Sequence, residues 1–337
     1  MKLRTYLFLL LSMMVTTGFA QTRLWITGSA VPGGTQELTK FPVSGSTSSC
    51  FKFHGRLLPG DLYIITTEEE KASTYYYAPK LVDSNIVNEG IAWKKTRTKE
   101  GSQWAVLFEA DNYRFTITTA TGGTVAGELF PWWYEAWIVG GCVADNQGVK
   151  EGEPGHWQIS AGKEMVRSSI NPYEWVWLGE LKSYNNDEPK RFKINGQYGW
   201  GPKVLHPFKQ DESILKSSQV CYGGADNKWS IENDGYYLIV TNVFTETIHG
   251  EYAQDEETFL SGASSRNDEA DGITVNGREV RVSSDVMLTA SLIAADGMRV
   301  DMQNGTQITL SAPAQGVYIV LLEGEGGRRI TRKVAIN

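Results

Sequence analysis

Two tryptophans in glycine-rich turns are the residues of this sequence best suited to binding chemistry. Trp157 follows a Pro-Gly-His run, and Trp200 stands between two glycines. A turn of this kind presents its side chain away from a sheet, where a ligand can reach it. A sugar has an apolar C–H face and a rim of hydroxyl groups, so a sugar site needs a flat ring and a few directed hydrogen-bonding groups.

Polar side chains precede Trp200 on the same short segment. Lys193, Asn195 and Gln197 can each donate hydrogen bonds to the rim of a sugar. The sequence therefore predicts a ligand-binding site formed by these three residues with Trp157 and Trp200. The alternative interpretation is that both tryptophans only cap the ends of a β-sandwich.

The sequence contains no arrangement typical of catalysis or of a metal centre. The four histidines are far apart, and no Gly-x-Ser-x-Gly motif or phosphate-binding glycine loop is present. A glycosidase needs a pair of carboxyl groups, which here would have to come from glutamates scattered along the sequence. Each of these glutamates is more typical of a residue exposed on the surface. We expect a protein without catalytic activity, metal or cofactor; the glutamates considered are Glu151, Glu153, Glu180 and Glu188.

An internal repeat supplies the elements that must position these residues. Each copy has a first strand, an alternating apolar strand ending in Gly-x-Leu, and a third short strand, and the alignment places Tyr63 opposite Lys193. Phe51 and Phe53 of the first copy align with Trp175 and Trp177, so those two tryptophans are predicted to be core residues. The strands are expected at 24–30, 51–57 and 62–65 in the first copy, and at 136–141, 175–181 and 192–194 in the second.

The expected fold is all-β: two tandem Ig-like β-sandwich modules followed by a small C-terminal β-sandwich. Each module has about 110 residues, which is enough for its own core. The modules are assigned to 21–131 and 132–254, the acidic linker to 255–271, and the C-terminal domain to 272–337. Three Asn-Gly or Asp-Gly pairs predict tight hairpin turns in that domain, beginning at Asn276, Asp296 and Asn304.

Composition and the N-terminal segment indicate an exported binding protein. Eleven Trp and 15 Tyr in 337 residues favour all-β cores or ligand-binding faces. The net charge of −7 leaves no basic surface for nucleic acid. Residues 1–20 are typical of a signal peptide, with a basic start, an apolar stretch and a small-x-small cleavage site.

Three cysteines cannot all pair with one another. Cys50, Cys142 and Cys221 match no metal-binding spacing, so we expect buried thiols. A bridge between Cys142 and Cys221 is the alternative.

These residues resemble the SusE/SusF-type outer-membrane starch-binding proteins of Bacteroidetes. The resemblance lies in the opening Trp-Ile-x-Gly, the Pro-Gly-His-Trp run, and the segments 51–63 and 192–200. It implies surface-displayed modules that bind glycan without cleaving it, with an outer-membrane uptake complex as a partner. It also implies that Trp157, Lys193 and Trp200 are the aromatic and basic members of the site.

The C-terminal segment is similar to the sorting-type domains of the same phylum. The similar residues are Gly316 to Val320 and the Lys333-Val334 pair. This resemblance implies secretion or surface attachment. The expected function is thus the binding of a polysaccharide or oligosaccharide, with a Kd of about 10 μM to 1 mM for a shallow site. The alternative function is a structural or adhesive surface protein whose modules act as spacers.

Overall fold

The computed structural model describes residues 21–43, 49–120, 122–143, 157–168, 171–183, 189–254, 272–294, 299–324 and 329–336. The predicted signal peptide and linker lie outside these residues. The described part is all-β, as predicted, and its one helical element is a 3-10 turn at Ile159–Ala161. No helix in that part is long and apolar enough to span a membrane.

The chain divides into two compact units. Among the described residues, the first contains 21–41 and 49–129, and the second contains 42–43 and the residues from Phe130 onward. This division falls within two residues of the predicted module boundary at Pro131. The second unit holds both the second module and the C-terminal strands, which are described in turn.

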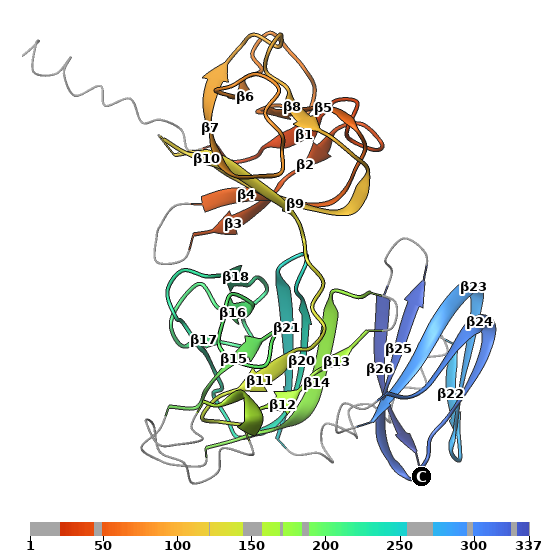
Figure 1. Ribbon diagram of the computed structural model, residues 1–337. Helices are drawn as coiled ribbons and strands as arrows, with labels where there is room; N and C mark the ends of the chain where they lie inside the picture. Colours follow the sequence, from red (N-terminus) through yellow and green to blue (C-terminus); the bar gives the residue numbers. More distant parts are fainter. Residues whose placement is uncertain are drawn as a thin grey trace, which may run out of the picture. The chain divides into compact units, whose positions relative to one another are not determined.

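The first unit is built from two β-layers that share strand β7. One layer has the order β2-β1-β5-β6-β7, the other continues as β7-β10-β9-β4-β3, and β8 pairs with β5 (Figure 1). Phe51 and Phe53 point into the core between them, as the alternating pattern predicts. The strands are β1 (Trp25–Thr27), β2 (Gln36–Glu37), β3 (Thr39–Pro42), β4 (Ser49–Leu57), β5 (Gly60–Ile65), β6 (Tyr76–Pro79), β7 (Asn88–Thr96), β8 (Trp104–Val106), β9 (Ala110–Thr118) and β10 (Thr124–Leu129).

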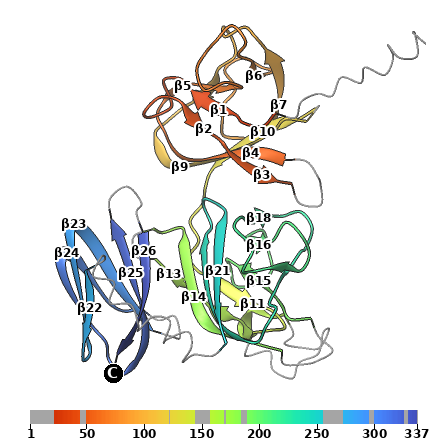
Figure 2. The same cartoon turned by 180° about the vertical axis from the view of Figure 1, so that it is seen from behind.

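The second module has two facing sheets. One sheet has the order β12-β11-β15-β16-β18, with β19 beside β15 and β17 beside β19, and the other has the order β13-β14-β20-β21. Figures 1 and 2 show the latter strands side by side from both directions. The strands are β11 (Trp137–Val139), β12 (Lys163–Glu164), β13 (Val166–Arg167), β14 (Glu174–Leu181), β15 (Arg191–Asn195), β16 (Val204–His206), β17 (Glu212–Ser213), β18 (Cys221–Tyr222), β19 (Trp229–Ser230), β20 (Gly235–Asn242) and β21 (Thr247–Ala253).

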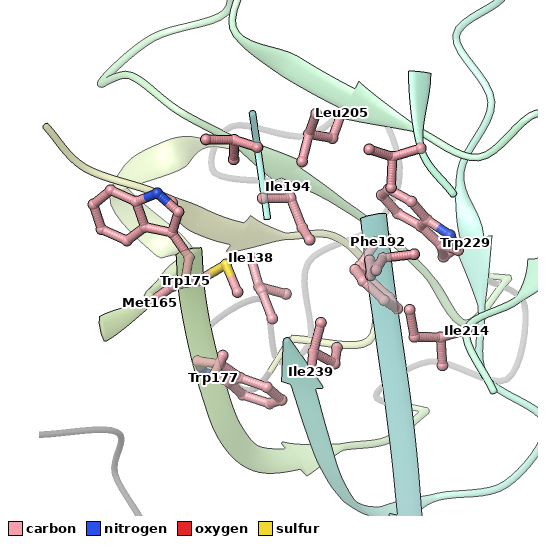
Figure 3. Packing of buried hydrophobic residues seen from close by; sticks show 14 of the residues in the cluster. Ile138, Met165, Trp175, Trp177, Phe192, Ile194, Leu205, Ile214, Trp229 and Ile239 are labelled. Atoms are coloured by element: carbon pink, nitrogen blue, oxygen red, sulfur yellow. The ribbon is translucent and has the colours of Figure 1, made fainter. Parts of the chain in front are cut away.

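The core of the second module confirms the prediction for its two central tryptophans. Trp175 and Trp177 are buried, and Ile138, Ile194 and Leu205 of the facing sheet belong to the same cluster. Figure 3 shows both indole rings among these aliphatic side chains. Large rings fill the space between the sheets of this module because residues at alternate positions of β14 share its inner face.

Strand pairing shows that the repeat is also a structural repeat. In the first unit Thr27 pairs with Tyr63, and in the second module Val139 pairs with Lys193 at the corresponding position of the ladder. Trp25 and Trp137 likewise occupy equivalent positions, opposite Ile65 and Asn195. The alignment of Tyr63 with Lys193 is therefore confirmed. The same backbone site carries an aromatic ring in one copy and a cation in the other.

The C-terminal strands form a five-stranded sheet with its own core. The strand order is β22-β23-β25-β26, with β24 paired to β23, and Val280, Leu292 and Leu310 are among the buried residues. Strand β23 pairs with β24 along both of its halves, with a register shift between Ser283 and Leu288. Along its other edge, the first half pairs with β22 and the second half with β25. The strands are β22 (Ile273–Asn276), β23 (Glu279–Ala294), β24 (Arg299–Ser311), β25 (Gly316–Gly324) and β26 (Arg329–Ile336).

The three predicted hairpin turns of this domain have different outcomes. Asn276-Gly277 is a turn, since Asn276 pairs with Glu279 and Gly277 has a φ of +58°. The prediction at Asn304 is wrong: Asn304 and Gly305 pair with Thr289 and Leu288 inside the continuous strand β24. The long ladder with β23 overrides the local turn preference of Asn-Gly. The predicted turn at 296–297 lies outside the described residues.

The cysteines are buried thiols, as expected. All three lie in the described part of the chain, and the alternative bridge between Cys142 and Cys221 is not formed. The Cys142 sulfur lies 3.4 Å from the carbonyl oxygen of Arg191, and that of Cys221 lies 3.4 Å from the carbonyl oxygen of His206. Each thiol thus fills a small space against a strand backbone.

Candidate ligand-binding site

The outer face of the β15–β16 sheet carries an open hollow of about 550 Å³. Ile194 and Leu205 point into the core, so their neighbours Lys193, Val204 and His206 point outward. A turn that follows β15 and a loop that precedes β19 form its rim. We call this hollow the pocket; its lining residues are Trp157, Lys193, Trp200, Gly201, Pro202, Val204, His206, Gly223, Asp226 and Lys228.

Three of the five predicted site residues meet in this pocket. The Lys193 ammonium nitrogen lies 4.3 Å from the centre of the Trp200 ring and 6.0 Å from the centre of the Trp157 ring. Both distances fall within the range of cation–π attraction. Trp200 is 47% exposed, so one large aromatic surface of the pocket is open to a ligand.

Asp226 links two lysines of the pocket. Its Oδ1 accepts a hydrogen bond from Lys193 at 2.7 Å, and its Oδ2 accepts one from Lys228 at 3.0 Å. Burial alone would raise the pKa of Asp226, but the bonds from the two lysines outweigh it and hold the pKa below its ordinary value. The pocket therefore contains a fixed carboxylate between two fixed ammonium groups.

His206 extends this polar group as a neutral imidazole. Its Nδ1 lies 3.0 Å from the carbonyl oxygen of Asn227, which can only accept, so Nδ1 carries the proton. Burial lowers the pKa of His206; the bond to Asn227 opposes this effect, and the positive charge of Lys193 adds to it. At neutral pH the charges in the described pocket lining are two ammonium groups and one carboxylate.

Trp157 is held in an unusual backbone conformation. Its φ is +55°, in the left-handed region that bulky residues rarely adopt. Such conformations persist where the surrounding structure imposes them, and they are frequent at binding sites. The ring also lies 5.8 Å from the Lys228 ammonium nitrogen, so both lysines of the pocket approach it.

Asn195 and Gln197 do not line the pocket. Asn195 is 0% exposed, and its amide donates to the backbone carbonyl oxygens of Gln197 and Gly199. The prediction that Asn195 donates to a ligand is therefore corrected: its amide instead holds the turn that carries Trp200. Gln197 packs its side chain against Gly201, where an added Cβ would approach its Nε2 to 1.9 Å.

Sequence reasoning did not find Asp226, Lys228 or the role of His206 in the site. Asp226 and Lys228 are more than twenty positions from Trp200, His206 lies on the next strand β16, and only folding brings all three beside Lys193. The signal that was available is the turn Gly223-Gly224, which has two positive φ values and is followed, after Ala225, by the polar run Asp226-Asn227-Lys228. A polar segment after such a turn is typical of a rim loop.

The equivalent position in the first unit has a different surface. Tyr63 replaces Lys193, and the Tyr63 and Tyr76 rings meet edge to face with centroids 6.0 Å apart. The Lys99 ammonium nitrogen lies 5.1 Å from the centre of the Tyr63 ring and 2.7 Å from the Glu70 carboxylate. The first copy thus has a tyrosine ring at the position where the second copy has the pocket lysine.

No protein-family model matches the sequence, and no curated protein matches it. Within the described ranges, no group of three or more His, Cys, Asp or Glu residues could hold a metal ion. The site must therefore be interpreted from its own chemistry.

Proposed function

We propose that this chain is a non-catalytic glycan-binding protein and that the pocket of the second module holds the sugar. The observation that carries the proposal is the convergence of Trp157, Trp200 and Lys193, which meet on an open surface from separate segments. Stacking on an indole satisfies the apolar face of a sugar ring, and the lysines and Asp226 satisfy its hydroxyl rim. The ligand is a starch-like or other polysaccharide.

The charge arrangement supports binding rather than glycoside hydrolysis. A glycosidase needs a second carboxyl group at a suitable distance from the first, usually with a raised pKa on the acid. Among the described lining residues, Asp226 supplies the carboxylate, and the lysines lower its pKa. An anion held in this way accepts hydrogen bonds but is a poor proton donor at neutral pH.

Surface exposure favours glycan binding over the structural or adhesive alternative. A tryptophan that only caps a sandwich buries its ring, whereas Trp200 leaves nearly half of its surface open. We further propose that the chain is exported and displayed at the cell surface, where it presents polysaccharide to an outer-membrane uptake complex. The signal-like N-terminus and the sorting-type C-terminal segment support this location.

A glycan array probed with the full mature chain tests the proposal. Wild-type protein should bind at least one polysaccharide, and Trp157→Ala and Trp200→Ala should each weaken that binding by tenfold or more. Trp132→Ala is a matched control, because Trp132 is also 47% exposed and does not line the pocket. A wild-type protein that binds no glycan, or a Trp132 variant as weak as the Trp200 variant, would reject the proposal.

A further inference from the structure

A second aromatic surface adjoins the pocket on the same face of the sheet. Tyr198 is 69% exposed and lies two residues before Trp200 on the turn between β15 and β16. Its ring meets the Trp137 ring at an interplanar angle of 74°, with centroids 6.4 Å apart. Trp137 pairs with Asn195 in the sheet, so its side chain points outward on the side where Lys193 lies. We call Glu135, Trp137 and Tyr198 the second platform.

Glu135 fixes both aromatic residues of the second platform. One oxygen of its carboxylate accepts a hydrogen bond from the backbone N–H of Tyr198, and the other accepts one from Trp137 Nε1 at 3.2 Å. A carboxylate has further lone pairs for hydroxyl groups. The second platform therefore combines an open ring with a hydrogen-bond acceptor, which is the same pairing that the pocket offers.

The turn holds the second platform and the pocket in a fixed relation. Asn195 Nδ2 donates to the carbonyl oxygens of Gln197 and Gly199, on either side of Tyr198. Gly199 has a φ of +114°, which few other residues could adopt at this bend. Since consecutive Cα atoms are about 3.8 Å apart, the Cα atoms of Tyr198 and Trp200 are at most about 7.6 Å apart. Neighbouring units of one sugar chain could therefore contact both rings.

The first unit indicates that the second platform is not simply a cover for the strand. Trp25 occupies the position equivalent to Trp137, and the Arg23 guanidinium covers its ring at 4.9 Å. Arg23 in turn is paired with Glu37, so a charged side chain performs the covering role there. A tyrosine that only shielded Trp137 would bury its own ring, whereas Tyr198 leaves most of its surface exposed.

We propose that the second platform is an additional subsite for the same glycan, so that the ligand is a chain of several sugar units and not a terminal sugar. This inference rests on the proposed function of the pocket. The chain would stack one unit on Trp200 and a neighbouring unit on Tyr198, with Glu135 accepting a hydroxyl hydrogen bond. Affinity should then rise with chain length and depend on Tyr198 only for long chains.

Titration calorimetry on the full mature chain tests the inference. The probes are maltose and maltohexaose, cellobiose and cellohexaose, and the corresponding xylan and mannan oligomers. Wild-type protein should bind one hexasaccharide about tenfold more tightly than its disaccharide. Tyr198→Ala should lose most of this difference in affinity and keep the affinity for the disaccharide. Tyr198→Phe should keep the affinities for both lengths. Trp200→Ala should lose binding of both lengths.

Controls separate failure of the inference from failure of the proposed function. Tyr134→Ala removes a tyrosine that is even more exposed but belongs to neither surface, so it should bind like wild type. If Tyr198→Ala binds the hexasaccharide as tightly as wild type, or if wild type binds both lengths equally, the second subsite is rejected and the pocket function stands. If wild type binds none of the eight probes, both are rejected. Circular dichroism of each variant confirms folding.

Discussion

Lys193 donates to Asp226 at 2.7 Å from a side chain that is 9% exposed, whereas the side chain that accepts is 64% exposed. The two partners of this ion pair therefore have different environments. The lysine stem is covered by the sheet and by the pocket aromatics, and its charge depends on Asp226 for compensation. The carboxylate has access to water and has Lys228 as a second partner. Removal of Asp226 and removal of Lys193 should therefore change the stability of the second unit by different amounts.

Asp226→Ala should destabilise the second unit more than Lys193→Met does. Removal of Asp226 leaves a largely buried ammonium group without its carboxylate, which costs about 1–3 kcal/mol. Removal of the lysine charge leaves an accessible carboxylate that still pairs with Lys228, so the loss should be below about 1 kcal/mol. Urea unfolding followed by tryptophan fluorescence measures both; equal losses would contradict the asymmetry. Both variants should weaken glycan binding.

The stability of the second unit should decrease as the pH falls below about 6.5. Burial lowers the pKa of His206 from its ordinary value of 6.5, and Lys193 and Lys228 add to this effect while Asn227 and Asp226 oppose it. On acidification the unfolded chain binds a proton before the folded chain does, so the free energy of unfolding decreases, by at most about 1.4 kcal/mol per pH unit.

His206→Gln should flatten this part of the pH profile. Urea unfolding at pH 7.5, 6.5 and 5.5 gives the slope for the variant and for wild type. His249→Gln is the control for the loss of an imidazole, because His249 lies exposed on β21. A variant at position 206 with the wild-type slope would show that another group causes the pH dependence.

The sequence was sufficient for the sheets but not for the polar half of the site. Period-two patterns located β4, β14 and their partners, because burial on one face of a strand imposes that spacing. Trp157 and Trp200 were found because glycine-rich turns present side chains. Asp226 could not be placed, since its contact with Lys193 depends on how a distant loop packs against strand β15.

Two local predictions failed because tertiary structure overrode them. Asn195 has the right chemistry for a ligand donor, but its position on β15 places it beneath the following turn, where it bonds backbone carbonyls. Asn304-Gly305 has the preferred residues of a hairpin turn, but pairing with β23 keeps it extended. In both cases the residues have the local preference that the prediction used, but their neighbours in the fold determine their role.

Trp157→Gly should be more stable than Trp157→Ala, although both lose the ring. At a φ of +55°, glycine has no steric penalty, whereas alanine keeps the left-handed strain of about 1 kcal/mol. The two variants should weaken glycan binding to the same extent, because each removes the stacking surface. Thermal unfolding and calorimetry together test this. A glycine variant less stable than the alanine variant would mean that relief of the left-handed strain does not outweigh the greater freedom of glycine in the unfolded chain.

Trp177→Phe should be tolerated far better than Trp177→Ala, because the first unit uses phenylalanine at the equivalent position. In each copy a glycine two residues later accommodates the ring: an added Cβ on Gly55 would lie 3.1 Å from Phe53 Cζ, and one on Gly179 would lie 2.7 Å from Trp177 Cζ2. Truncation to alanine should cost about 3–5 kcal/mol through the cavity that it leaves, and phenylalanine should cost less than half of that.

Gly179→Ala should destabilise the wild-type protein, but it should destabilise the Trp177→Phe variant less, because the smaller ring leaves more room for the methyl group. Urea unfolding of the four proteins forms a double-mutant cycle, and additive losses would show that the glycine does not serve to accommodate the ring.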